Sequence, residues 1–401
     1  MKIIALMALI IIIIGIFERK KHNKNLHNIP SIIHVNGIRG KSSTTRLISA
    51  ALRSGGLKVL AKTTGSAARI IYPDQSEKEI IRHGPPSISE QKKIVQLAVE
   101  EEVDVLVIEC MAVSPEIQWS SENLFLNADY MIITNVRNDH LDKMGNNLLE
   151  IAETISLSLP YNSNVISSEK KLARLIKEKS EMRNNQYSST DNITISKEEL
   201  QLFEKEVFAD NIACAIKTAQ CFNIDRKTAL KGMFSATEDP GSLKYYLLKE
   251  KNRNIIFINA FAANDRDSTE IIWNRVSKNF DNLPVENASI YALINHRSDR
   301  GFRLKEFAEF LTKKNRFNAY LLSGALKFRQ RRLLKKILNS QKNILNLNLS
   351  IFALNKFNKL SNYFNNLESN EDLIIFGCGN IHGDAEIISK FFSESGVEIK
   401  C

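Results

Sequence analysis

The sequence predicts an α/β fold with a parallel sheet in a central domain and a second, smaller α/β domain. Strand-like and helix-like patterns alternate from Ser31 to about Ala236, as a parallel sheet requires. The alternation resumes after the turn-rich stretch 237–242, which we take as the domain boundary. The 401 residues exceed the size at which one hydrophobic core stops growing, about 250–300 residues, so two domains are expected.

The chain begins with an apolar run from Ile3 to Phe17, followed by four basic residues within 19–24. A spanning helix needs about 20 apolar residues, with roughly 17 as the lower limit, so this run is marginal. No small-residue cleavage site follows, which argues against a removed signal peptide. The basic flank favours an uncleaved anchor in the cytoplasmic membrane over residues 1–24, with the body of the chain in the cytoplasm. A buried or interfacial helix is the alternative.

A strand, a glycine-containing turn and a helix open the central domain. The turn follows Ile32-Ile33, precedes a helical pattern over 44–52, and reads Asn36-Gly37-Ile38-Arg39-Gly40-Lys41-Ser42-Ser43. This is the layout of a phosphate-binding loop, in which Lys41 reaches the terminal phosphates and the Ser42 hydroxyl binds Mg²⁺. The Walker A pattern places a glycine where this chain has Val35, so the motif alone also fits an ordinary strand-to-helix turn.

Two further apolar runs, 104–108 and 128–134, also end in polar residues. Glu109 follows the first run, and Asn135 follows the second. Ligands of open α/β sheets lie beyond the carboxyl ends of the strands. We therefore expect one crevice to contain residues from all three strand ends: Lys41, Ser42, Glu109, Asn135, Asp139, His140 and Asp142. Any one of them alone could instead be a solvated charge or a helix cap.

The later elements follow from similar patterns. A helix is expected from Asn211 to Phe222 and another over 228–233, whereas the polar stretch 180–192 reads as a surface loop. In the second domain, three apolar runs that end in polar or glycine residues predict strands at 255–260, 290–295 and 373–377.

These motifs resemble those of the Mur ligase superfamily. Gly37-x-x-Gly40-Lys41-Ser42-Ser43 is similar to its G-T-N-G-K-[ST]-[ST] loop, and Thr134-Asn135-Val136-x-x-Asp139-His140-Leu141-Asp142 to its T-N-[IV]-x-x-D-H-[LM]-D motif. The segment 208–215 resembles a worn H-N-x-x-N-x-x-A-A helix start, with Asn211 at the adenine-side Asn. The resemblance implies a Mur-ligase-like ATP-binding domain over 25–238, a Rossmann-like domain over 239–401, and ATP and Mg²⁺ as cofactors.

Within the superfamily, the sequence resembles the catalytic subunits of poly-γ-glutamate synthases of the CapB/PgsB type. The stretches that carry this resemblance are 36–42, 82–86, 109–113 and 138–145. Cell-wall ligases place a nucleotide-sugar domain before the loop, where only a short leader stands here. Many also place a carbamylated Lys where this chain reads Glu150 to Ile155, without a Lys. The resemblance implies an ADP-forming ligase that polymerises glutamate into a capsule-type polymer, together with other membrane subunits.

The resemblance also assigns roles to residues. The cofactor-binding set comprises residues 36–43 with Asn135, Asn211, Arg297 and Arg300, and the magnesium ligands are Ser42, Glu109 and His140. Lys41 and the metal would neutralise charge as a phosphoryl group moves to the γ-carboxylate of glutamate. The α-amine of another glutamate would then attack the acyl phosphate, with Asp139 or Asp142 as candidates to accept its proton. Alternatives are another Mur-type ligase, such as a folylpolyglutamate synthase, or a membrane-attached NTPase that energises export.

The amino-acid composition argues against several other classes of protein. Five cysteines without C-x-x-C spacing argue against zinc sites and a disulfide framework. The net charge of +10 comes in part from the N-terminal flank and in part from a basic run at 327–336. Such runs are most often solvated faces, and contact with anionic lipid or an acidic polymer is the next reading. No zinc finger or RNA-binding aromatic motif accompanies it, so nucleic acid is not an expected partner. A homo-oligomer is compatible with the sequence.

Overall fold

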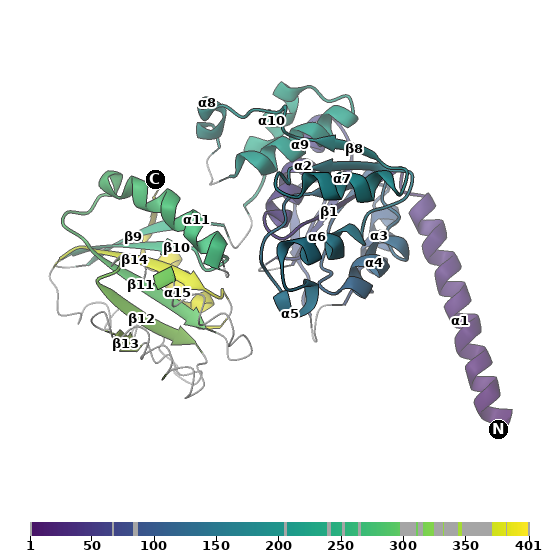
Figure 1. The fold of residues 1–401 in the computed structure, drawn as a ribbon, viewed down its shortest axis with the longest axis horizontal. Helices are drawn as coiled ribbons and strands as arrows, with labels where there is room; N and C mark the ends of the chain where they lie inside the picture. The colour runs from purple at the N-terminus through teal and green to yellow at the C-terminus, as the bar shows by residue number, and fades with distance from the viewer. Residues whose placement is uncertain are drawn as a thin grey trace. The chain divides into compact units, whose positions relative to one another are not determined.

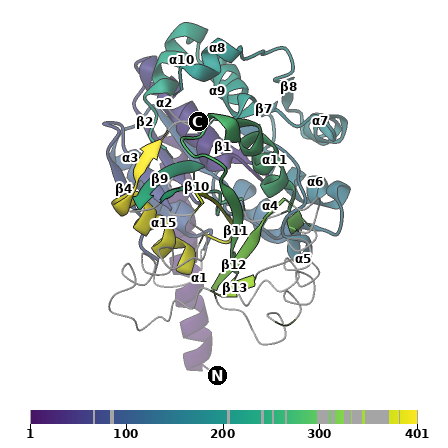
Figure 2. The ribbon, with the colours of Figure 1, turned by 90° about the vertical axis from the view of Figure 1, so that its left-hand side faces the viewer.

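The computed structural model describes residues 2–65, 68–82, 87–203, 207–238, 242–250, 253–263, 266–296, 310–311, 316–324, 332, 344–346, 371–381 and 383–399. The chain divides into two compact units, Met1–Asp239 and Pro240–Cys401, and each has its own sheet (Figures 1 and 2). The expected α/β fold is confirmed. The basic run at 327–336, apart from Arg332, lies outside the described residues.

The first unit contains an eight-stranded sheet in the order β4-β3-β2-β5-β1-β6-β7-β8. The strands from β2 to β8 in this order are parallel, and β3 and β4 continue the sheet antiparallel at one edge. Their bounds are β1 Ser31–Asn36, β2 Val59–Thr63, β3 Arg69–Ile71, β4 Glu77–Glu79, β5 Val105–Glu109, β6 Tyr130–Ile133, β7 Asn164–Ser167 and β8 Gln186–Ser189. The carboxyl ends of β1, β5 and β6 therefore lie side by side.

Helices cover both faces of this sheet because its central strands are apolar on both sides. Alternate residues of β5 enter different cores: Val105 and Val107 pack with α2, α9 and α10, whereas Leu106 and Ile108 pack with α3. Helices α6 and α7 cover the sheet on the α3 side, over β6 and β7. The helix bounds are α2 Lys41–Ser54, α3 Glu90–Glu100, α4 Pro115–Asn123, α5 Leu141–Met144, α6 Leu148–Ser156, α7 Ala173–Glu181, α8 Lys197–Gln201, α9 Ala209–Cys221 and α10 Arg226–Phe234.

Helix α1, Lys2–His27, projects from the body of the first unit (Figure 1). Its last turns are attached, because Leu26 is buried in the core beside α3 and His22 Nε2 donates to the Phe125 carbonyl at 2.9 Å. The large apolar side chains from Ile3 to Phe17 are 43–75% exposed. Among the helices that the structure describes, none combines the length and apolarity needed to cross a membrane.

The second unit has a seven-stranded sheet in the order β13-β12-β11-β14-β10-β9-β15. The first five strands in this order are parallel, and β9 and β15 are antiparallel additions. Helix α11, Arg266–Val276, packs on one face through Trp273, and α15, Asp384–Ser395, on the other through Phe392. The remaining bounds are β9 Lys244–Glu250, β10 Arg253–Asn259, β11 Ser289–His296, β12 Ala319–Gly324, β13 Ile344–Asn346, β14 Leu373–Gly379, β15 Val397–Ile399 and the 3₁₀ helix Ser277–Asn282.

One sequence-based expectation for the first unit is wrong. The polar stretch 180–192, expected as a surface loop, includes the end of α7 and the edge strand β8, which pairs in parallel with β7. An edge strand has one partner and little apolar content here, so its sequence lacks the continuous apolar run that marked the central strands.

Candidate active site

The turn between β1 and α2 is a compact loop whose two glycines are required. Gly37 and Gly40 have φ values of +119° and +78°, a region that glycine adopts without strain. A Cβ atom on Gly37 would lie 2.2 Å from Thr134 Oγ1, and one on Gly40 would lie 2.6 Å from Asn211 Oδ1. The loop is thus packed against the end of β6 and the start of α9, where Asn211 lies beside Gly40. The adenine-side role of Asn211 stays a prediction.

The residues after β6 hold the loop in place through hydrogen bonds. The Ile38 N–H donates to the Asn135 carbonyl at 3.0 Å, and the Arg39 N–H donates to Asn135 Oδ1 at 3.0 Å. In return, the Asn135 amide and the Thr134 hydroxyl donate to the Arg39 carbonyl at 2.9 and 2.8 Å. Asn135 therefore shapes the loop, and its direct contact with a nucleotide stays a prediction.

Lys41, Ser42 and Glu109 form the part of the site suited to phosphate and metal. Lys41 Nζ donates to the Gly37 and Ile38 carbonyls at 2.9 and 3.3 Å, so its charge lies over the loop. Ser42 Oγ donates to Glu109 Oε2 at 2.8 Å, and the Thr64 N–H donates to the same oxygen at 2.6 Å. Two hard oxygen ligands thus lie together next to a phosphate loop, which fits Mg²⁺ chemistry.

Asp139 and His140 lie at the start of α5. Asp139 is buried and accepts from Arg39 NH2 at 3.0 Å and from the His140 N–H at 2.7 Å. His140 has φ +49°, and its Nε2 lies 3.9 Å from Asp139 Oδ2. Asp142 is exposed in the first turn of α5. Within the described residues, no three His, Cys, Asp or Glu side chains form a metal-binding group, so the assignment of His140 as a ligand stays a prediction.

Asn36 supports the loop from beneath. Its side-chain amide donates to Gln118 Oε1 and Ser158 Oγ, each at 2.7 Å, and its Oδ1 accepts from the Gly37 N–H at 2.7 Å. The side chain is 1% exposed. Asn36 therefore shapes the loop from a buried position, and its part in nucleotide binding stays a prediction. Arg297 and Arg300, also predicted to bind the nucleotide, lie outside the described residues.

A buried ionic network underlies the same strand ends. His34 Nδ1 donates to Glu122 Oε2 at 2.8 Å, and both side chains are at most 1% exposed. Burial alone would lower the pKa of His34, but the Cys110 thiol and the Glu122 carboxylate together raise it to about 9. The ring is therefore protonated near neutral pH and binds β1 to α4.

A second ionic cluster, around the buried Lys62, lies on the β2 side of Glu109. Lys62 in β2 is fully buried and pairs with Glu90 at 2.8 Å, while Arg82 contacts both oxygens of Glu90 at 2.9 and 3.0 Å. Burial raises the pKa of Glu90, but hydrogen bonds from Arg82 and Lys62 outweigh it and hold that pKa at about 2. Sequence reasoning missed Lys62, although a Lys within an apolar strand run was a visible sign.

Comparisons with known families agree with this geometry. A family model of the Mur ligase middle domain matches residues 35–237, and one of the poly-gamma-glutamate synthase CapB C-terminal domain matches residues 245–395. The chain belongs to the Mur ligase family, the class defined by a phosphate loop on such a sheet followed by a second α/β unit. Within that class it belongs to the CapB family of poly-gamma-glutamate synthases.

Two curated relatives support the assignment to the CapB family. The chain is 40% identical over 301 residues to PGA synthase CapB of Bacillus subtilis (strain 168), covering 75% of this chain and 76% of that protein. It is 38% identical over 308 residues to the capsule biosynthesis protein CapB of Bacillus anthracis, covering 76% of this chain and 66% of that protein.

Solved structures share the fold at low sequence identity. The bifunctional folylpolyglutamate synthase/dihydrofolate synthase of Yersinia pestis, complexed with AMPPNP and Mn ion, matches with a TM-score of 0.66 and 15% identity, covering 93% of this chain and 91% of that chain. FolC of Escherichia coli in complex with ADP matches with a TM-score of 0.63 and 14% identity, covering 94% and 92%. At these identities the likeness shows the fold alone.

Proposed function

We propose that this chain is an ADP-forming amide ligase that uses ATP to join glutamate residues into poly-γ-glutamate. The observation that carries the proposal is the contact between Ser42 and Glu109 beside Lys41, at the strand ends of a chain of the CapB family. A loop of backbone N–H groups, a Lys and two hard oxygen ligands together suit a nucleoside triphosphate with Mg²⁺.

Different residues have different roles in phosphoryl transfer. Lys41 exchanges the carbonyls of Gly37 and Ile38 for phosphate oxygens, and its charge stabilises the γ-phosphoryl group as it moves to the γ-carboxylate of glutamate. Ser42 and Glu109, with His140 as the third predicted ligand, would hold Mg²⁺, which would supply positive charge next to the phosphates. The acyl phosphate then gives the carbon a leaving group, and attack by an α-amine yields the amide and phosphate.

The proton of the attacking amine is accepted by a carboxylate near the start of α5. Asp139 is committed to Arg39 and the His140 N–H, whereas Asp142 is exposed. Of the two candidates from the sequence, Asp142 is therefore the more accessible one.

The deciding experiment measures glutamate-dependent ADP release together with product mass. The proposal expects ADP release that requires glutamate and products that differ by whole glutamate residues, with γ linkage shown by fragmentation. Release that depends on a folate acceptor instead would favour a folylpolyglutamate synthase activity. ADP release without a new amide bond would favour an NTPase that energises another process.

We also propose that α1 attaches the chain to the cytoplasmic membrane and that separate membrane subunits export the product. Exposed apolar side chains over Ile3–Phe17, followed by a basic flank, support attachment. A polymer with one negative charge per residue does not cross a bilayer unaided, since one charge at its centre costs several kcal/mol. Vesicles that contain only this chain, ATP, Mg²⁺ and glutamate should accumulate no polymer on the far side, and efficient accumulation there would contradict the need for partners.

A further inference from the structure

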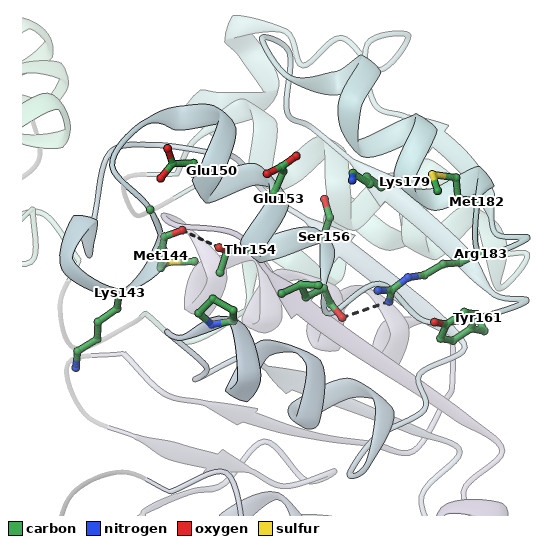
Figure 3. A pocket seen from close by; sticks show the side chains of 13 residues that line it. Lys143, Met144, Glu150, Glu153, Thr154, Ser156, Tyr161, Lys179, Met182 and Arg183 are labelled. Carbon is green, nitrogen blue, oxygen red and sulfur yellow. Dashed lines mark hydrogen bonds between the residues drawn. The ribbon is translucent and has the colours of Figure 1, made fainter.

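A cavity of about 760 Å³ lies beside α5, α6 and α7 in the first unit (Figure 3). Its volume falls within the range of roughly 300–1,000 Å³ that is typical of small-molecule sites. In Figure 3, Lys143 lies at one end, Tyr161 and Arg183 lie at the other, and Glu150 and Glu153 lie along the upper side between them. None of these residues is used by the mechanism above.

The cavity begins next to the segment 134–142, which contains the predicted catalytic residues Asp139, His140 and Asp142. Lys143 directly follows Asp142 in α5, so the candidate proton acceptor and the cavity share one short helix. The Thr154 hydroxyl donates to the Met144 carbonyl at 2.7 Å and fixes α6 against α5 (Figure 3). A ligand in the cavity could therefore extend from the reacting end of the sheet along α6.

Two of the three cationic side chains that line the cavity are available to an anionic ligand. Neither Lys143 nor Lys179 forms an ion pair with any residue that the structure describes. The guanidinium of Arg183 donates to the carbonyls of Leu157 and Leu159 and lies 4.9 Å from the centre of the Tyr161 ring. Arg183 is thus a fixed charge, and the Lys179 amine points toward Ser156 on the α6 side (Figure 3).

The lining also contains two carboxylates, so it is not a simple polyanion site. Glu150 is partly satisfied by the N–H of Asn146 and the side chain of Asn147, at 2.8 and 2.7 Å, whereas Glu153 is exposed. A mixed lining of this kind suits a ligand with several carboxylates and one ammonium group. A γ-linked glutamyl oligomer has that composition, with one free α-carboxylate on each residue, a further γ-carboxylate at one end and a single α-amine at the other.

We propose that this cavity binds the growing γ-glutamyl chain, with Lys179 and Arg183 contacting its carboxylates. The proposal rests on the proposed function for the identity of the ligand, but its test is a binding measurement that needs no ATP. The probe is a γ-linked glutamate hexamer labelled with a fluorophore, and the protein is the full chain.

Lys179 is the residue to test, since it is a partly exposed side chain and its loss should not affect folding. Lys177, on the same helix but outside the cavity lining, is the matched control. Lys179→Gln should weaken hexamer binding, measured by fluorescence anisotropy, by about threefold to tenfold, as expected for one charge-assisted contact. Lys177→Gln should bind like the wild type. An equal effect of the two substitutions would overturn the proposal.

Two further readouts use the unmodified chain. The hexamer should protect Lys179 from acetylation, read by peptide mass spectrometry, more than it protects Lys177, and equal protection would count against the site. An α-linked hexamer should bind more weakly, whereas equal binding with the same dependence on Lys179 would reject recognition of the γ linkage. If glutamate-dependent ADP release fails while hexamer binding depends on Lys179, the function is wrong and the site stands. If release succeeds and Lys179 has no effect, the site is wrong and the function stands.

Discussion

Lys41 is the side chain on which ATP turnover should depend most directly. Lys41→Ala is expected to lower the turnover rate by about 100-fold or more, since one charge contact to a transferring phosphoryl group is removed. The fold should persist, because Lys41 is partly exposed and, among the described residues, its side chain bonds to carbonyls of its own loop. Lys58→Ala, at an exposed position before β2, is the control. Near-normal turnover of the Lys41 variant would remove the phosphate-loop assignment.

Glu109 should set the magnesium requirement. Glu109→Gln keeps the shape of the side chain but removes its charge, so the Mg²⁺ concentration needed for half-maximal ADP release should rise while turnover falls. His140→Ala should act in the same direction if His140 is a ligand. Glu100→Gln, on the exposed side of α3, should change neither quantity. Unchanged magnesium dependence in both site variants would show that they are structural.

The buried His34–Glu122 pair, together with the neighbouring Cys110, should make stability depend on alkaline pH. The pKa of His34 is about 9 in the folded chain against 6.5 for an unperturbed ring, so folding takes up a proton between these values. The contribution of the pair to stability is complete below about pH 6.5 and is lost as pH rises through about 9. The melting temperature of the wild type should fall more steeply from pH 7 to 10 than that of His34→Gln. Parallel curves would contradict a raised pKa.

At the scale of elements, a comparison of the two glycines at the ends of α2 distinguishes the cost of a left-handed backbone from the cost of a steric clash. Gly40 and Gly56 have φ values of +78° and +89°, but a Cβ on Gly40 meets Asn211, whereas one on Gly56 meets nothing within 4 Å. Gly56→Ala should cost about 1–2 kcal/mol of unfolding free energy, from the left-handed conformation alone. Gly40→Ala should cost more and should also raise the KM for ATP. Equal costs and an unchanged KM would mean that the Asn211 contact does not shape the loop.

The elements that could be predicted from the sequence are those whose own residues determine their structure. β1, β5, β6, β10, β11 and β14 are buried on both faces, so their apolar runs identified them directly. β8 could not be found in this way, because this edge strand is polar and is stabilised by its pairing with β7 rather than by its own composition.

The candidate site was likewise predictable only in part. The motifs around Lys41, Glu109 and Asn135 could be recognised in the sequence because each follows a predicted strand. The support from Lys62, Glu90 and His34 was not, because it depends on side chains that meet only after folding. The boundary between the units lies within the turn-rich stretch 237–242, where glycine and proline interrupt every regular pattern.

At the scale of the whole molecule, helix α1 has two parts. Its first turns project from the first unit, and its last turns are packed against it. Deletion of residues 1–17 should release the protein from membranes in a flotation assay, while ATP turnover stays unchanged, because the first core residues of α1, such as Leu26, are retained. Phe17 is 68% exposed and Leu26 is 8% exposed, so the cut removes no core. A full-length protein found wholly in the soluble fraction at low salt would contradict membrane attachment.

The contact between Gly40 and Asn211 also bears on how the chain is made. The loop leaves the ribosome early, but the side chain that packs against it is encoded on the order of 170 residues later. At about 5–20 residues per second, that interval is roughly ten to thirty seconds. A nascent chain that ends before α9 therefore carries the phosphate-loop sequence without the partner that shapes it, and translation of α9 is the step that completes the nucleotide pocket of the first unit.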